Sequence, residues 1–188
     1  MPRPPRDCAP GIHHVGTGAA GPGIYFRDDL DYATWIRLLV ATTARYGWTT
    51  IIVVAMPTHW HAIFEVPDNS LPEGMQYLNG EYSRDFNEHH ERVGYLVRDR
   101  YWSRRKSTDL ELVNAFCYAA NNPTMAGIVS RAENWRWSSY ATTVGLSDAF
   151  SFVDASRVTA QFGPTPVEAQ NALRRYVTDL ADRSRLKP

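Results

Sequence analysis

Two apolar runs separated by a short break dominate the hydrophobic pattern of this chain. The first, Ile51–Ala55, is β-branched or small, and the second, Ala62–Val66, resumes the apolar character after a polar interval. Side chains of this kind favour strands, and a proline between the runs favours a tight turn. The pattern therefore predicts a pair of strands within Thr49–Pro67, joined by a bend near Met56–Thr58.

Apolar side chains recurring at three and four residues predict helices around this pair. The expected helices run from Asp28 and Asp29 to about Tyr46, from Glu73 to His90, from Leu110 to Asn121 where Pro123 stops it, and from Val167 to about Asp182. A short first strand is expected over His13–Thr17. This order predicts an α+β fold, an antiparallel sheet with helices packed on one face.

Length and composition narrow the class of protein. A chain of 188 residues with 44% apolar residues fits one globular domain with an appended C-terminal element. No apolar run approaches the roughly 20 residues that cross a bilayer, and no membrane association is expected. Cys8 and Cys117 form neither a disulfide framework nor a CxxC pair, so a reducing, cytoplasmic location is expected.

The second run begins with two histidines, His59 and His61, on either side of Trp60. Strand side chains alternate between faces, so both imidazoles point the same way, roughly 7 Å apart at the backbone. Two imidazoles so placed can bind one metal ion, while Trp60 anchors the strand from behind. The alternative is a pair of surface or hydrogen-bonded histidines without a metal. The motif indicates a metal site only if a third ligand lies elsewhere in the chain.

Tyr118 and Asn122 lie four residues apart on an expected helix and therefore share a face. The amide oxygen of Asn122 is a reasonable third metal ligand, and it would bring the Tyr118 phenol to the edge of the metal. The alternative makes Tyr118 a half-buried packing residue and Asn122 a helix cap before Pro123.

The segment Glu91–Lys106 holds six basic and two acidic residues with interleaved aromatic rings, although the net charge of the chain is zero. Guanidinium groups suit phosphates and aromatic faces suit unstacked bases, so the segment fits single-stranded nucleic acid. The alternative is a solvated basic loop with its rings in the core. The residues expected to hold DNA are Arg98, Arg100, Tyr101, Trp102, Arg104, Arg105 and Lys106.

Several segments resemble, in order, motifs of the REP-associated tyrosine transposases, which are relatives of the HUH single-tyrosine transposases. MPTHWHAIFEV resembles MPNHxHLLxE, and residues 75–103 follow the pattern MQ.LN..Y...FN..H.R.G.L...R. CYAANNPTMAGIV then resembles RYIHLNPVRAGLV, and WRWSSY resembles WPWSSY. The resemblance covers roughly residues 1–145, which leaves 146–188 as a C-terminal helical extension.

The resemblance implies the HUH endonuclease fold, a ferredoxin-like or RRM-like sheet with the histidines on a central strand and the nucleophile on a separate helix. His59 and His61 match the metal-binding histidines, Tyr118 matches the nucleophile, and Asn122 matches a residue suited to be the third ligand. Tyr82 matches another tyrosine of the family, which is expected to be structural or to face the substrate, with the role of nucleophile as the alternative. The implied cofactor is a divalent metal ion, Mg²⁺ or Mn²⁺.

Three departures from the family pattern concern DNA binding. The usual arginine before the tyrosine is Cys117, the early SRGN segment is replaced by residues 16–20, and GRF has become Asp99-Arg100-Tyr101. These changes leave the expected chemistry in place and put the DNA target and the full activity in question.

The hypothesis is therefore a transposase that cleaves and joins single-stranded, hairpin-forming repeat DNA through a covalent phosphotyrosine. It would act as a monomer or a homodimer. A rival hypothesis is a domesticated protein that binds DNA hairpins without cutting them, and a third is a metal-dependent nuclease that uses water. Replacing Tyr118 discriminates among the three, because only the first requires its phenol.

Overall fold

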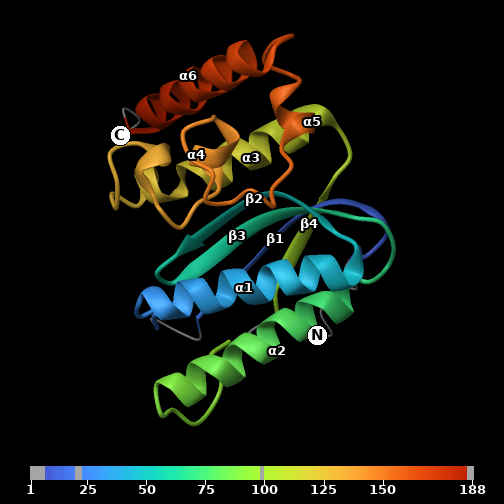
Figure 1. Cartoon of the computed structure of the whole chain (residues 1–188), viewed down its shortest axis with the longest axis vertical. Helices are drawn as coiled ribbons and strands as arrows, with labels where there is room; N and C mark the ends of the chain where they lie inside the picture. Colours follow the sequence, from blue (N-terminus) through green and yellow to red (C-terminus); the bar gives the residue numbers. More distant parts are fainter. Residues whose placement is uncertain (1–6, 20–22, 98–99, 186–188) are drawn as a thin grey trace.

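A four-stranded antiparallel sheet with the order β2-β3-β1-β4 lies at the centre of the molecule (Figure 1). A computed structural model describes residues 7–19, 23–97 and 100–185. The strands are β1 (Gly11–Gly18), β2 (Thr49–Met56), β3 (His59–Val66) and β4 (Trp102–Lys106). The predicted strand pair is confirmed as β2 and β3, joined by the bend at Pro57 and Thr58.

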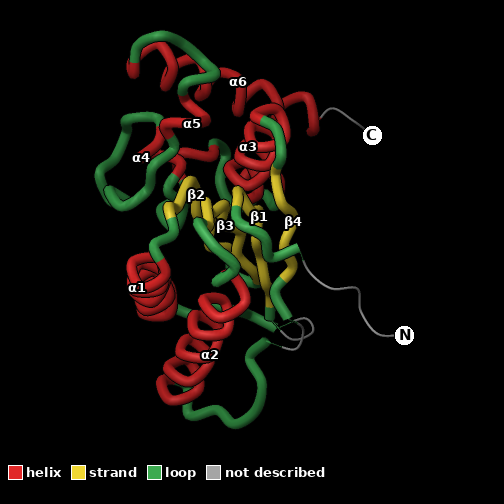
Figure 2. The backbone as a smooth tube through the Cα atoms, turned by 90° about the vertical axis from the view of Figure 1, so that its right-hand side faces the viewer, coloured by secondary structure: helices red, strands yellow, loops and turns green. Residues whose placement is uncertain are grey.

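Helices cover both faces of this sheet, as Figures 1 and 2 show. The longer helices are α1 (Asp29–Tyr46), α2 (Leu71–His89), α3 (Asp109–Met125) and α6 (Pro166–Arg185). The short ones are η1 (Ala132–Asn134), α4 (Tyr140–Thr143) and α5 (Ser156–Thr159). In the part of the chain that the structure describes, no helix combines the length and the apolar character that a bilayer crossing requires.

The predicted α+β class with an antiparallel sheet is confirmed, but the expectation that helices pack on one face is too narrow. One core contains Trp60 and Phe64 with Trp35 of α1. A second core, on the opposite face, contains Val54 with Phe116 of α3. Strand β2 is buried on both faces, which explains why its sequence is apolar throughout rather than alternating.

The first helix has the ends that its sequence predicts. Asp28 is the N-cap and accepts a hydrogen bond from the backbone N–H of Asp31, whose side chain accepts from the Asp28 backbone N–H in return. This reciprocal capping satisfies two N–H groups that have no partner within the helix. Gly47 ends the helix with a φ of 67°, a left-handed conformation that glycine adopts without strain.

Helix α3 is longer than predicted, because Pro123 lies inside its last turn and the helix continues to Met125. The C-cap is Ala126, so Asn122 is not the helix cap that one interpretation of the Asn-Pro pair expected. Proline removes one backbone hydrogen bond from this turn, and α3 packs against α6. Asn121 donates from Nδ2 to the carbonyl of Val177 over 2.9 Å.

Strand β4 was not predicted from the hydrophobic pattern, because the sequence WSRRK has no apolar run. It pairs only with β1 among the described strands, antiparallel, at the edge of the sheet. Charged side chains on an edge strand discourage pairing with other chains. The basic segment is therefore partly a strand, and alternation along it sorts its side chains between two faces.

The region predicted as a C-terminal extension, residues 146–188, contributes α5 and α6. Leu173 and Val177 of α6 are buried in the same core as Phe116 of α3. Figure 2 shows α6 on the side of α3 that faces away from the sheet. The last helix therefore supports the helix that carries Tyr118 rather than the sheet itself.

The two cysteines should differ sharply in reactivity. Cys117 is buried on α3, and desolvation by burial raises the pKa of its thiol to about 12. Cys8 is only partly buried. Because the thiolate is the reactive form, we expect iodoacetamide to label Cys8 and to spare Cys117 in the native protein. Peptide mass spectrometry measures this, with urea-unfolded protein as the control; equal labelling rates in the native state would contradict the burial of Cys117.

Candidate active site

His59 and His61 lie on the face of β3 that α3 covers, and Trp60 lies in the core on the opposite face. The two imidazole centroids are 5.0 Å apart. His61 is 5% exposed, and neither of its ring nitrogens has a hydrogen-bond partner among the described residues. The predicted common orientation of the pair is therefore present, and it leaves ring nitrogens available for a ligand.

A third histidine, His14 on the neighbouring strand β1, completes this group. Its ring centroid lies 5.3 Å from that of His61, and its Nε2 is buried without a hydrogen-bond partner in the described structure. No motif in the sequence marks His14 as a site residue. The sequence places His14 in an expected strand, which is the one sign that could have pointed to it. Only the pairing of β1 with β3 brings its ring to His61.

The electrostatic environment keeps these imidazoles neutral. Desolvation by burial lowers the pKa of His61 to about 4 and that of His14 to about 3. Burial lowers the pKa of His59 as well. The nearby Asn122 side chain acts in the opposite direction and raises the pKa values of His59 and His61. No hydrogen bond within 3.5 Å joins this amide to His61. Neutral imidazole is the form that binds a metal ion, so the donor set fits a divalent cation.

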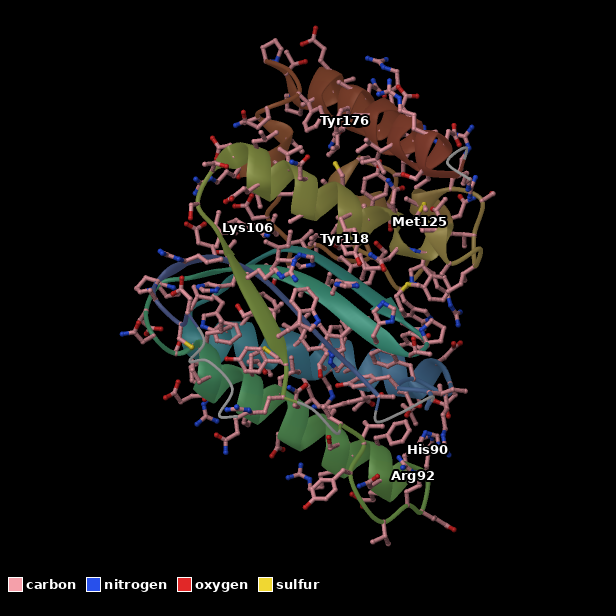
Figure 3. All side chains as sticks on the ribbon, turned by 180° about the vertical axis from the view of Figure 1, so that it is seen from behind. His90, Arg92, Lys106, Tyr118, Met125 and Tyr176 are labelled. Atoms are coloured by element: carbon pink, nitrogen blue, oxygen red, sulfur yellow. The ribbon has the colours of Figure 1, made fainter. Side chains whose placement is uncertain are left out.

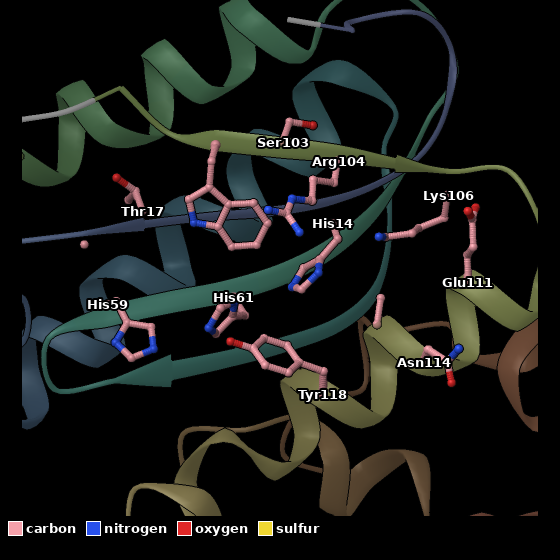
Figure 4. A pocket seen from close by; sticks show the side chains of 13 residues that line it. His14, Thr17, His59, His61, Ser103, Arg104, Lys106, Glu111, Asn114 and Tyr118 are labelled. Carbon is pink, nitrogen blue, oxygen red and sulfur yellow. The ribbon is translucent and has the colours of Figure 1, made fainter.

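Tyr118 stands at the mouth of this histidine group. Its ring centroid lies 5.5 Å from that of His61 and 6.0 Å from that of His14. The side chain is 60% exposed, and Figure 4 shows its hydroxyl directed towards His61. One helical turn later, Asn122 donates from Nδ2 to the Tyr118 carbonyl over 2.8 Å. The amide oxygen of Asn122 is thereby left free to accept or to coordinate.

A cleft of about 800 Å³ opens in front of these residues, between β1, β3 and β4 on one side and α3 on the other. Trp102 forms part of its wall, with its ring edge-on to His14 at 4.8 Å, and is 39% exposed. Gly16 makes this packing possible, because a Cβ atom there would lie 2.5 Å from the Trp102 ring. The cleft therefore has an exposed indole as part of its wall, beside the histidine group.

The side chains of the basic segment Glu91–Lys106 do not all face the same surface. Trp102, Arg104 and Lys106 line the cleft. Arg105 turns to the other face of β4 and forms an ion pair with Asp7 at 2.7 Å. Arg100 is exposed just before the strand. Arg98, which was also expected to hold DNA, lies outside the residues that the structure describes.

Tyr101 was expected among the residues that hold DNA, but the structure places it in the core. Its side chain is 6% exposed and packs in the cluster on the α1 and α2 face of the sheet. The residue before β4 faces inward while Trp102 faces the cleft, because neighbouring strand residues point to opposite faces. Trp102 is therefore the aromatic residue of this pair that is available for stacking.

The structure also separates Tyr82, the alternative nucleophile, from the histidines. Tyr82 lies on α2, is 0% exposed, and donates its hydroxyl to the carbonyl of Tyr25 over 2.8 Å. Burial raises the pKa of its phenol. The ring packs in the core on the opposite face of the sheet, so its role is structural.

Comparisons with known proteins agree with these features. Residues 26–109 match the family model described as Transposase IS200 like, a segment that includes both strand histidines and ends before Tyr118. A putative REP-associated tyrosine transposase of Haemophilus influenzae is 24% identical over 110 residues, which cover 53% of this chain and 62% of that relative's length.

A solved structure of a REP-associated tyrosine transposase bound to a REP hairpin superimposes with a TM-score of 0.69. It covers 82% of this chain and 93% of the other at 14% identity, which establishes a common fold. The resemblance predicted from the sequence motifs is therefore confirmed: the chain is similar in sequence to a putative REP-associated tyrosine transposase, and it shares the fold of a solved one. It also matches the Transposase IS200 like family model over a segment that carries both strand histidines.

Proposed function

We propose that this protein cleaves and rejoins single-stranded DNA in a metal-dependent reaction with Tyr118 as the nucleophile. The observation that carries the proposal is the exposed phenol of Tyr118 beside buried imidazoles with unpartnered ring nitrogens. A phenol buried in the core could not reach a phosphate, and an exposed phenol without neighbouring metal ligands would not indicate catalysis. Together, in a cleft of about 800 Å³, they suit phosphoryl transfer.

The residues that would hold the metal ion are His59 and His61, with Asn122 or His14 as the further ligand. The set supplies three protein ligands, so at least one open position would remain for a phosphate, as expected of a catalytic rather than a structural site. A divalent ion such as Mg²⁺ or Mn²⁺, when bound, neutralises charge that builds on the phosphate in the transition state. Cellular abundance favours Mg²⁺, whereas imidazole ligands favour Mn²⁺.

Tyr118 supplies the covalent step. Its phenolic oxygen attacks the scissile phosphorus while the bond to the 3′-oxygen breaks, so a phosphotyrosine forms and a 3′-hydroxyl leaves. The phenol proton passes to solvent, which reaches this exposed side chain, and the leaving oxygen takes up a proton. A second 3′-hydroxyl reverses the same displacement, and the two strands become joined without an external energy source.

Arg104 and Lys106 would hold the phosphates of the strand, and Trp102 would stack on an unpaired base. Arg100, exposed before β4, extends this basic path. Because these contacts release counterions, binding should weaken steeply as the salt concentration rises. A hairpin of the kind present in the solved relative is the proposed substrate, since its unpaired nucleotides can enter the cleft.

The test uses dye-labelled single-stranded hairpins from the repeats that flank the gene, incubated with protein and Mn²⁺. We expect a labelled band at protein size on a denaturing gel with the wild type and with Tyr82→Phe. The Tyr118→Phe variant should bind the hairpin with similar affinity and form no adduct, because only the attacking oxygen is removed. Circular dichroism of both variants checks that each has folded.

The other outcomes are equally informative. An adduct in Tyr118→Phe would exclude Tyr118 as the nucleophile. Cleavage without an adduct in the wild type would favour a nuclease that uses water. Binding without cleavage in the wild type, on a hairpin from the flanking repeats, would favour a protein that recognises DNA and no longer cuts it.

A further inference from the structure

Four side chains that commonly bind metals meet on the side of the sheet away from the cleft. They are Asp28 and Asp31, at the start of α1, and His89 and His90, at the end of α2. One ligand atom from each lies within 4.8 Å of all the others. Figure 3 shows His90 at the far end of the molecule from Tyr118, so this group is separate from the proposed active site.

Short contacts already join the side chains of this Asp-His group in two His–Asp pairs. His90 Nε2 lies 2.9 Å from both carboxylate oxygens of Asp31, and His89 Nε2 lies 3.0 Å from Oδ2 of Asp28. In a tetrahedral zinc site with bonds of about 2.1 Å, neighbouring ligand atoms are about 3.4 Å apart. To surround an ion, the two His–Asp pairs would open by a few tenths of an ångström, and any ligand atoms that lie farther apart, within the 4.8 Å limit of the group, would move closer together.

Hydrogen bonds and packing contacts hold the side chains of this Asp-His group in fixed orientations. Asp31 is 3% exposed, and its Oδ2 also accepts from the backbone N–H of Arg27 at 2.7 Å. The His89 and His90 ring centroids are 4.3 Å apart, and the His90 ring also contacts Phe86 at 4.5 Å. Hydrogen bonds and packing thus orient a buried carboxylate and a mostly buried imidazole before any ion arrives.

Charge favours a cation here. The two carboxylates carry a formal charge of −2 between them when both are ionised. The guanidinium groups of Arg27 and Arg92 lie over the Phe86 ring, each 5.5 Å from its centroid, and form no ion pair with these carboxylates among the described residues. An ion bound by two neutral imidazoles and two carboxylates would leave the group electrically neutral.

We propose that Asp28, Asp31, His89 and His90 bind a divalent transition-metal ion, with zinc the best match to two nitrogen and two oxygen donors. The ion joins the first turn of α1 to the last residues of α2. It therefore braces the point at which the chain leaves α2 on its way to β4 and the cleft. This role is structural and does not depend on the chemistry proposed for Tyr118.

The test uses the full-length, metal-free chain carrying His59→Ala and His61→Ala, so that the strand histidines bind no metal. Titration with Co²⁺ should produce the visible absorption bands of a tetrahedral site, saturating at one ion per chain, and Zn²⁺ should displace them. Adding His89→Ala should remove the bands. Asp28→Asn should weaken binding at least about tenfold while preserving the helix cap, because asparagine caps as well as aspartate.

Asp29→Asn is the matched control, since this aspartate lies in the same turn but pairs with Arg136 instead. It should leave Co²⁺ binding unchanged. Zn²⁺ should also raise the thermal midpoint of the double variant and not that of the His89→Ala derivative. Bands that persist in His89→Ala, or no Co²⁺ binding at micromolar concentrations, would overturn the proposal and leave two hydrogen-bonded His–Asp pairs as the explanation.

Discussion

His61→Ala is expected to reduce metal-dependent cleavage of hairpin DNA by about a hundredfold or more, because it removes a metal ligand at the centre of the site. The His61 ring contacts the rings of His14, His59 and Tyr118. Both of its nitrogens lack a hydrogen-bond partner among the described residues, so they are available to bind the ion. Single-turnover cleavage at several Mn²⁺ concentrations measures the loss. Partial recovery at high Mn²⁺ would identify weakened ion binding as the cause.

The fold should survive this substitution. Alanine leaves a small cavity, but it also removes two buried nitrogens that are not hydrogen-bonded, and these effects oppose each other. His13→Ala is the matched control. The His13 ring is buried and bonded to Ser103 and to the carbonyl of Ala9, so its loss should lower stability without changing metal dependence. Full activity in His61→Ala would exclude this imidazole from the reaction.

Trp60→Ala should lower the free energy of unfolding by about 3–5 kcal/mol, the range typical of removing a buried aromatic residue. The indole is fully buried on the face opposite the histidines, with its ring 5.0 Å from that of Trp35. It is the packing link between β3 and α1. Urea denaturation followed by circular dichroism measures the change.

Trp102→Ala provides the comparison for this prediction. Trp102 is 39% exposed in the cleft, so its loss should destabilise the fold much less and weaken DNA binding instead. A change below about 1 kcal/mol in Trp60→Ala would show that the core on this side of the sheet tolerates a cavity. Similar losses in both variants would contradict the division between a core indole and a cleft indole.

The local sequence was sufficient for features set by neighbouring residues. The pleat of β3 places His59 and His61 on one face with Trp60 behind them, whichever strands lie alongside. The helical repeat places Asn122 one turn after Tyr118, and the cap residues Asp28 and Gly47 set the ends of α1. The family motifs, matched in order, added the association of the strand histidines with a distant tyrosine, which no local rule supplies.

Tertiary structure decided which of these residues meet. His14 joins the site because β1 pairs with β3, and Tyr101 faces the core because β4 pairs with β1 in one register. Tyr82 is separated from the histidines because α2 covers one face of the sheet and α3 the other. Strand pairing and helix placement depend on contacts between residues far apart in the chain, and the burial of a single side chain follows from them. The sequence by itself therefore determined the elements and their local geometry, whereas only the packed structure determined the composition of the site.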